Sequence, residues 1–412
     1  VHGGAAWTPR LTAQLGEEQG NLMVFPHGRG TSHWYVTQSH QDVWEVFADV
    51  AGTDISGADN IASDHGFNTD GLMTVDASRV YLSGYSMGGY GTYLFGLLYP
   101  DKFAAGYSTA GATTQGLWTG LGPELSVCSE PQGEADGDQA TACFVEANGG
   151  NANAQLNFRL LENARHLPLV IHHGSNDELV AISGIQRFAT RLQELGYRYD
   201  FLNFFGFEHY TQAITDEWRD GAYYLNQFSR PENPREVTYK VVPALTQALN
   251  TVSAGRLPGD SFAFNPDGAY WIDDIVHRDG DASDPAVFAQ VDARSLALAD
   301  TEHLAIPRLA DGTLLTDPTS MDPWGSTPLY SPLSHATPYA RQSQEWLTQG
   351  EAARSNGFTA TLTNVAYARF DAARMQLSLD GGDIVGVVAT DGDTTLGLAG
   401  LTPGSSLCLN GG

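Results

Sequence analysis

The stretch GYSMGG at residues 84–89 places a serine, Ser86, between glycines, where a short apolar run meets a longer one. Residues 80–82 are apolar and β-prone, which predicts a buried strand. Residues 87–99 are apolar on nearly all sides and are followed by Pro100, which predicts a buried helix. Ser86 would then lie on a sharp turn from strand to helix, and such a turn exposes a hydroxyl for nucleophilic attack. A strand-turn-helix with an incidental serine is the alternative.

A serine nucleophile needs a base, and the base needs an acid that orients it. Asp177 lies in a polar turn after a predicted strand at 167–172, and His209 follows the next predicted strand. Open α/β sheets gather their sites beyond the carboxyl ends of the strands. We therefore predict Ser86 as nucleophile, Asp177 as acid and His209 as base, with Glu178 as the alternative acid.

The negative oxygen of a tetrahedral intermediate needs two backbone donors. The amide of Met87, directly after the nucleophile, is predicted to be one of them. The amide of Gly4, in the opening VHGG, is predicted to be the other. The apolar residues 21–26 downstream of this loop predict the next strand of the sheet.

Taken together, these motifs resemble the α/β-hydrolase superfamily. The resemblance rests on GYSMGGYGTYLFGLLYPDKFAA, preceded by VHGG and followed by GSNDELV and FEHYTQ, and it covers residues 1–228. It is strongest to the secreted bacterial esterases and the prolyl-oligopeptidase-like serine hydrolases. It implies a doubly wound α/β sheet, a triad of Ser86, Asp177 and His209, and oxyanion donors at Gly4 and Met87. It leaves ester and peptide substrates open.

The start of the chain departs from the superfamily pattern. Members have strands before the His-Gly-Gly loop, whereas only Val1 precedes that loop here. An interior gap in a sheet would leave backbone groups unpaired. We therefore expect residues upstream of Val1, from the same precursor, to complete the sheet. The long polar stretch at 51–74 is predicted to be a surface insertion.

The composition indicates two domains and an acidic surface. The chain has 412 residues, too many for one typical core, and a net charge of −27 from 48 acidic and 21 basic residues. This charge argues against a nucleic-acid partner or an anionic membrane, and no run is long and apolar enough to span a bilayer. With only two lysines, such a surface suits a secreted, extracellular bacterial protein.

The three cysteines also concern whether the protein is secreted. Cys128 and Cys143 bracket a polar acidic loop, and a disulfide between them would restrain the loop and fit secretion. Two unpaired thiols are the alternative. Cys408 is predicted to be a small buried residue.

The chain changes character after residue 230. A linker with two prolines leads into short apolar runs separated by glycine, aspartate and proline. This pattern predicts a catalytic domain at 1–230 and an all-β, sandwich-like accessory domain at 236–412. The one segment predicted to be helical lies at 339–350. The aromatics of this region are expected in the core more often than on a sugar-binding face; those singled out are Tyr270, Trp271, Trp324 and Trp346.

No metal or cofactor is predicted. His172 and His173 are neighbours in a predicted strand and so point to opposite faces, which prevents them from sharing one ion. The acidic turns at 277–284 and 389–395 lack the full spacing of a calcium loop. The predicted reaction is hydrolysis of a small or polymeric carboxylic ester through an acyl-enzyme. The alternatives are a prolyl-oligopeptidase-like peptidase and a non-catalytic carbohydrate- or surface-binding protein.

Overall fold

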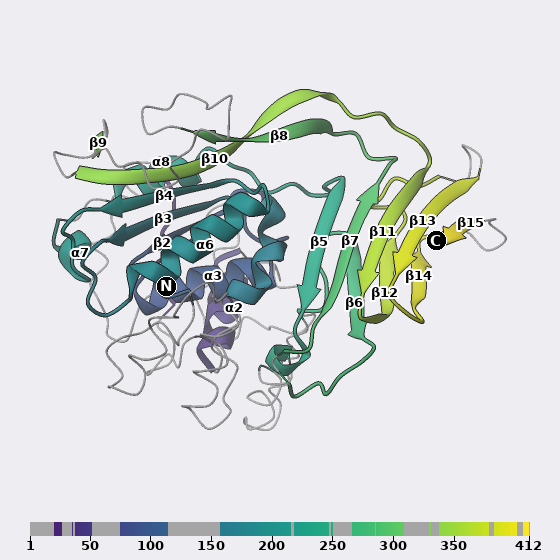
Figure 1. Cartoon of the computed structure of the whole chain (residues 1–412), viewed down its shortest axis with the longest axis horizontal. Helices are drawn as coiled ribbons and strands as arrows, with labels where there is room; N and C mark the ends of the chain where they lie inside the picture. The colour runs from purple at the N-terminus through teal and green to yellow at the C-terminus, as the bar shows by residue number, and fades with distance from the viewer. Residues whose placement is uncertain are drawn as a thin grey trace. The chain divides into compact units, whose positions relative to one another are not determined.

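A computed structural model describes the protein and gives its helices and strands (Figure 1). The residues described are 20–26, 35, 38–51, 75–113, 157–215, 218–246, 249, 266–284, 286–308, 329–330, 338–378, 383–401 and 407–411. The helices are α2 (Gln38–Ala51), α3 (Met87–Leu98), the 3₁₀ helix η6 (Phe158–His166), α6 (Ile182–Glu194), α7 (Thr211–Thr215) and α8 (Arg219–Leu225). The strands are β1 (Tyr81–Tyr85), β2 (Ala105–Thr109), β3 (Leu169–Gly174), β4 (Tyr199–Phe204), β5 (Glu236–Val241), β6 (Ile272–His277), β7 (Ala289–Ser295), β8 (Thr301–Arg308), β9 (Leu329–Tyr330), β10 (Pro338–Glu351), β11 (Gly357–Thr363), β12 (Val365–Asp371), β13 (Ile384–Thr390), β14 (Thr395–Ala399) and β15 (Leu407–Gly411).

The described residues divide into two compact units. Unit 1 takes those within Val1–Arg230, Ala248–Phe264 and Ala305–Glu345, and unit 2 takes those within Pro231–Gln247, Asn265–Leu304 and Trp346–Gly412. The sequence predicts a single boundary between residues 230 and 236. In the structure, the described residues within Ala305–Glu345 group with unit 1.

A mixed sheet forms the framework of unit 1. Its seven strands run in the order β1-β2-β3-β4-β10-β8, with β9 paired to β10. Strands β1 to β4 are parallel, and β10 is antiparallel to β4. Parallel neighbours need crossover connections, and here α3, η6 and α6 lie between the successive strands in the chain. The carboxyl ends of β1 to β4 therefore meet at one edge of the sheet.

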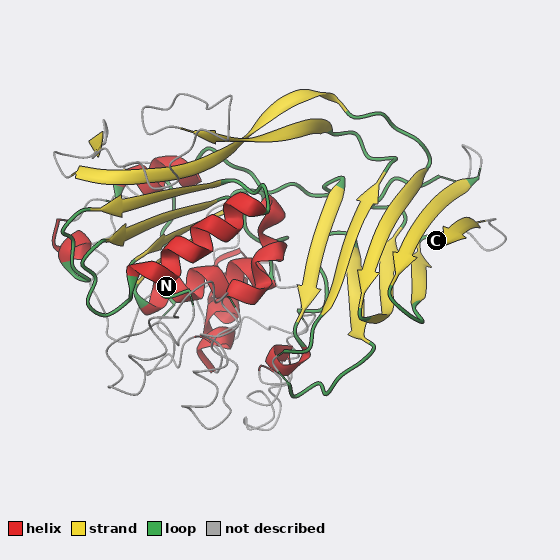
Figure 2. Ribbon diagram, viewed as in Figure 1, coloured by secondary structure: helices red, strands yellow, loops and turns green. Residues whose placement is uncertain are grey.

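Alternate side chains of β2 meet helices on opposite faces of this sheet. Ser108 lies against Gly89 of α3, whereas Tyr107 belongs to an apolar cluster with Trp218 and Ala222 on the α8 side. A strand alternates its side chains with a period of two, so the two faces are covered by different helices (Figure 2). The α/β class is thus present, while the complete doubly wound order stays a prediction.

The predicted helix at 339–350 is wrong, because this segment forms most of strand β10. β10 lies between β4 and β8, with Arg341 opposite Leu202 and Ser343 opposite Asp200. The guanidinium of Arg341 donates two hydrogen bonds, of 2.7 and 2.6 Å, to the carboxylate of Asp200. Three consecutive polar residues, Gln342, Ser343 and Gln344, are buried here, so no alternation of apolar and polar residues marks this strand in the sequence.

The strand predicted at 21–26 is also not found. The structure describes these residues as irregular backbone. Leu22 is 57% exposed, and Val24 and Phe25 are 37% and 38% exposed. An apolar run predicts an interior strand only if the fold buries it on both sides, which is not the case here.

Unit 2 contains two sheets with a common apolar core. One sheet has the order β15-β13-β11-β7-β5 and the other β14-β12-β6. Side chains from both sheets, such as Val291 and Phe358 from the first and Ile272 and Phe370 from the second, belong to one buried cluster. Trp271 joins this cluster, which places it in the core rather than on a binding face. These features agree with a sandwich-like arrangement.

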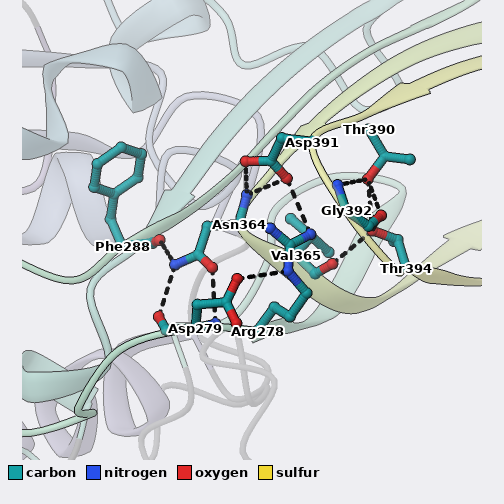
Figure 3. A network of polar contacts seen from close by, with 9 residues as sticks. All are labelled: Arg278, Asp279, Phe288, Asn364, Val365, Thr390, Asp391, Gly392 and Thr394. Atoms are coloured by element: carbon teal, nitrogen blue, oxygen red, sulfur yellow. Dashed lines mark hydrogen bonds and ion pairs between the residues drawn. The ribbon is translucent and has the colours of Figure 1, made fainter.

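A polar network closes one end of unit 2 at Asn364, which has a φ of 53°. Its Nδ2 donates to the carbonyls of Asp279 (3.0 Å) and Phe288 (2.8 Å), and its Oδ1 accepts from the amide of Asp279 (2.8 Å). Both carboxylate oxygens of Asp391 accept from the backbone amide of Asn364 (Figure 3). Arg278 pairs with Asp279 and Asp391. The acidic turns thus use these carboxylates for internal contacts.

Among the described residues, no helix is both long enough and apolar enough to cross a membrane.

Candidate active site

Ser86 lies on the turn between β1 and α3, with a φ of 57° and a ψ of −121°. Positive φ is costly for a side chain with a Cβ and persists only where the surroundings enforce it. Here the Ser86 amide donates to the carbonyl of Thr109 on β2 (2.8 Å), and its carbonyl accepts from Tyr90 in α3 (3.1 Å). The sheet and the helix therefore hold the turn at Ser86 from both sides.

Two glycines make this turn sterically possible. A Cβ added to Gly84 would lie 2.0 Å from the carbonyl oxygen of Gly88. A Cβ added to Gly89 would lie 2.5 Å from the Cα of Gly111 and 2.7 Å from the Oγ of Ser108. The G-x-S-x-G-G spacing thus lets the chain reverse tightly and lets α3 approach the end of β2.

The structure brings the three residues of the predicted triad together. The Nε2 of His209 lies 2.8 Å from the Oγ of Ser86, and its Nδ1 lies 2.9 Å from both carboxylate oxygens of Asp177. Ser86, His209 and Asp177 are only 8%, 2% and 9% exposed. Ser86 follows the end of β1, Asp177 follows the end of β3 and His209 follows the end of β4. The arrangement can pass a proton from the serine to the imidazole while the carboxylate fixes the ring.

Backbone amides hold the carboxylate of Asp177 in place. Its Oδ1 accepts from the amides of Leu179 (3.0 Å) and Val180 (2.8 Å). Burial acts to raise the pKa of Asp177, but the hydrogen bond from His209 and the nearby His173 outweigh it, so the pKa is lowered. Asp177 is therefore ionised at neutral pH, as an orienting acid must be.

Glu178, the alternative acid, has a different contact. Its Oε2 accepts a 3.1 Å hydrogen bond from the backbone amide of His209, while the Nδ1 of that ring meets Asp177. Tyr85 makes the matching contact on the other side, because its hydroxyl donates to the carbonyl of His209 (2.6 Å). The only sequence signal of Tyr85 is its position directly before the nucleophile.

His172 and His173 point to opposite faces of β3, as predicted. The Nδ1 of His172 lies 2.9 Å from the hydroxyl of Tyr107 and 2.8 Å from the amide nitrogen of Gln212. The Nε2 of His173 donates to the carbonyl of Val180 and lies 3.4 Å from Asp177. Burial lowers the pKa of His173 and lowers that of His172 to about 3. Within the described part of the chain, no cluster of three or more metal-ligating side chains is found.

Four other residues singled out in the sequence lie outside the described part of the chain, namely Gly4, Cys128, Cys143 and Trp324, and so does the stretch at 52–74. Met87 is described and is the first residue of α3. The first amides of a helix have no intrahelical acceptor and carry partial positive charge. The Met87 amide thus directly follows Ser86 at the positive end of α3.

The chain matches a known protein family. The fold class and the motifs are those of the α/β-hydrolase superfamily. Within it, the chain belongs to the prolyl oligopeptidase family, whose sequence profile matches residues 7–229, just over half of the 412 residues. No curated protein sequence matches the chain significantly.

Several solved structures match part of the chain. A thermostable esterase is 19% identical, with a TM-score of 0.25, over 39% of this chain and 34% of its own. A puromycin-hydrolyzing peptidase of Mycobacterium tuberculosis is 20% identical, with a TM-score of 0.28, over 44% and 26%. The acylaminoacyl peptidase of Pyrococcus horikoshii is 21% identical, with a TM-score of 0.25, over 37% and 23%. The chain thus covers about a third or less of the length of each of these proteins.

Proposed function

We propose that this serine hydrolase cleaves carboxylic esters through an acyl-enzyme on Ser86. The supporting observation is the continuous set of contacts from the Oγ of Ser86 through His209 to Asp177. In the first step, Ser86 attacks the acyl carbonyl and its proton moves to the Nε2 of His209. The tetrahedral intermediate then collapses, and the leaving alkoxide takes that proton.

The second step returns the enzyme to its starting state. His209 takes a proton from water, the resulting hydroxide attacks the acyl carbon, and Ser86 leaves with the proton held by His209. Asp177 stays ionised and keeps the ring in the tautomer that presents Nε2 to the serine. We propose the amides of Met87 and Gly4 as the two oxyanion donors, which would supply several kcal/mol of transition-state stabilisation, about 3 kcal/mol for each donor.

The choice of an ester rather than an amide rests on leaving-group chemistry. An alkoxide leaves more readily than an amine and so needs less help from the protonated His209. The family match favours a peptidase as the second candidate, because prolyl oligopeptidase gives the family its name. The substrate is proposed to be a small or polymeric ester.

Purified enzyme tests this choice with matched substrates. An aryl ester, an alkyl ester and a proline amide with one common acyl group would be compared, with Ser86→Ala as the blank. We expect kcat/KM to be higher for the alkyl ester than for the amide. The ratio of these two values should exceed the ratio of the uncatalysed hydrolysis rates of the same two substrates. Faster turnover of the amide after the same correction would favour the peptidase.

We also propose that the protein is secreted and that Cys128 and Cys143 form a disulfide. The acidic, lysine-poor composition and the 14 residues between the two cysteines support this proposal. Closing such a loop should stabilise the protein by roughly 3 kcal/mol in the chain-entropy model. Mass spectrometry of unreduced protein should find the two peptides joined, and quantitative thiol labelling of both residues would contradict the bridge.

A further inference from the structure

We propose that Tyr85 and Glu178 are positioning residues that clamp the backbone of His209. This inference rests on the proposed function, because it concerns the base of that same site. Tyr85 directly precedes the nucleophile, and Glu178 directly follows the acid. Both Tyr85 and Glu178 form a hydrogen bond to the backbone of His209.

The clamp consists of two hydrogen bonds to one residue. The hydroxyl of Tyr85 donates to the carbonyl of His209 at 2.6 Å, and the carboxylate of Glu178 accepts from its amide at 3.1 Å. Together they fix the two peptide groups that flank the Cα of His209. The ring of Tyr85 also packs beside the imidazole, with 5.4 Å between ring centres. The base is thus held by its backbone on both sides, as well as by Asp177 at its Nδ1.

Backbone restraint matters because His209 lies in a connection rather than in a strand or helix. It follows β4 and precedes the short helix α7. A rotation of its peptide would move Nε2 away from the Oγ of Ser86, and displacements of about 1 Å can cost about a hundred-fold in rate. Burial raises the pKa of Tyr85, with a further contribution from Asp177. The hydroxyl therefore remains a donor throughout the pH range of an assay.

The chain offers a matched control for each residue. Tyr81 lies on the same strand as Tyr85, and its hydroxyl also donates to a backbone carbonyl, that of Phe228, at 2.9 Å. Tyr81→Phe therefore removes the same kind of bond without touching His209. Glu208 is an exposed carboxylate adjacent to His209 in the chain. Glu208→Ala removes the same charge as Glu178→Ala but no contact to the His209 amide.

The test compares these variants in two assays at 25 °C, with melting temperatures recorded for each. One assay measures kcat and KM on an aryl ester. The other measures the second-order rate at which a fluorophosphonate inactivates the enzyme, a reaction in which Ser86 bonds to phosphorus, fluoride leaves and His209 takes the proton. The second assay reports on the nucleophile and base whatever the natural substrate is. If wild-type enzyme fails to react, the proposed function fails; if it reacts, the clamp is tested on its own.

We expect Tyr85→Phe to lower kcat and the inactivation rate by about ten-fold with little change in KM, the scale of one hydrogen bond. Tyr81→Phe should leave both rates close to wild type. Glu178→Ala should lower both rates by about five-fold, and Glu178→Gln should restore most of the loss because its amide oxygen can still accept. Glu208→Ala should have little effect.

Two outcomes would overturn the clamp. The first is equal rates for Tyr85→Phe and Tyr81→Phe. The second is an equal loss in Glu178→Gln and Glu178→Ala, which would make the charge of Glu178 rather than its hydrogen bond the active feature. Should Tyr85→Phe fail to fold, the comparison of Glu178→Gln with Glu178→Ala still tests the hydrogen bond to the His209 amide.

Discussion

Ser86 in unit 1 and Asn364 in unit 2 are both non-glycine residues at sharp turns with positive φ, 57° and 53°. Ser86 joins β1 to α3, and Asn364 joins β11 to β12. Their side chains are used in opposite ways. That of Asn364 makes three hydrogen bonds to backbone groups of Asp279 and Phe288, whereas the hydroxyl of Ser86 faces the imidazole of His209.

The comparison shows two ways to maintain an unfavourable backbone. Asparagine tolerates positive φ better than most residues, and its amide here stabilises the turn that requires it. Serine has no such preference, so the Ser86 turn depends on its backbone contacts to Thr109 and Tyr90. The Asn364 side chain serves stability, and the Ser86 side chain is available for chemistry.

The largest expected effect is on catalysis at the Ser86 turn. Ser86→Ala should lower kcat by about 10⁴-fold or more, and Asp177→Asn by about 10³- to 10⁴-fold, because each removes a member of the proposed triad. Asn364→Gly should leave kcat/KM nearly unchanged. Steady-state kinetics on an aryl ester measures all three. The assignment of the acid would be wrong if Glu178→Gln were as damaging as Asp177→Asn.

The second effect is on stability at the Asn364 turn. Asn364→Gly keeps a backbone that accepts positive φ but loses three hydrogen bonds, so unit 2 should lose about 2 kcal/mol. Hydrogen exchange of β11 and β12, followed by mass spectrometry, measures this loss.

Gln376 provides the matched control for this prediction. It also lies in unit 2 with a φ of 59°, its side chain is exposed, and the described structure contains no hydrogen bond from that side chain. Gln376→Gly should therefore leave stability unchanged or raise it slightly. Equal losses in the two glycine variants would mean that the Asn364 side chain contributes nothing beyond its backbone conformation.

A smaller effect should separate two inactive variants at Ser86. Ser86→Gly and Ser86→Ala both lose the hydroxyl, but only glycine accepts this φ and ψ without strain. Strain of about 1–3 kcal/mol, less about 0.5–1 kcal/mol for the added freedom of the unfolded glycine, leaves the glycine variant more stable by about 1 kcal/mol. Denaturant unfolding measures the difference. Equal stabilities would indicate that the turn is not strained.

Acid should change the stability of the two units in opposite directions. Burial lowers the pKa of His40 and His172 in unit 1 to about 3, from 6.5. Between those values the unfolded chain binds protons that the folded unit does not, so unit 1 loses stability as the pH falls. Burial, with Asp274 nearby, raises the pKa of Asp267 in unit 2 to about 6, from 3.8. The folded unit 2 then binds the extra proton and gains stability as the pH falls from about 6 to 4.

Hydrogen exchange at pH 7 and pH 4.5, corrected for intrinsic rates, can follow the two units separately. The variant Asp267→Asn should remove the gain in unit 2 and leave the response of unit 1 unchanged. A gain in unit 2 that persists in this variant would assign it to other groups.

Much of the site could be predicted because its signals are local. The glycine spacing around Ser86 can be recognised from a few neighbouring residues. The same holds for the polar turns that follow apolar runs at Asp177 and His209. The structure brings these three side chains within 2.9 Å of their partners. The clamp was not predicted, because a tyrosine before the nucleophile and a glutamate after the acid carry no local signal of a common partner.

The two wrong predictions of secondary structure concern segments whose burial depends on partners distant in the sequence. Residues 339–350 combine good helix formers with no clear alternation, which favoured a helix. They form a strand because Arg341 pairs with Asp200, 141 residues away, and because β4 offers an unpaired edge that an added strand satisfies. In 21–26, an apolar run predicted a strand, yet three of its large side chains are exposed.

The sequence by itself determined the α/β class, the order of Ser86, Asp177 and His209 along the chain and the turn at Ser86, because these depend on neighbours along the chain. Only the tertiary structure decided that a strand from beyond residue 330 extends the sheet of unit 1, that Asp177 rather than Glu178 meets the Nδ1 of His209, and that Tyr85 and Glu178 bond to the backbone of His209. The physical reason is that hydrogen bonds between distant segments are set by how the strands come together, and a sequence window does not contain both partners.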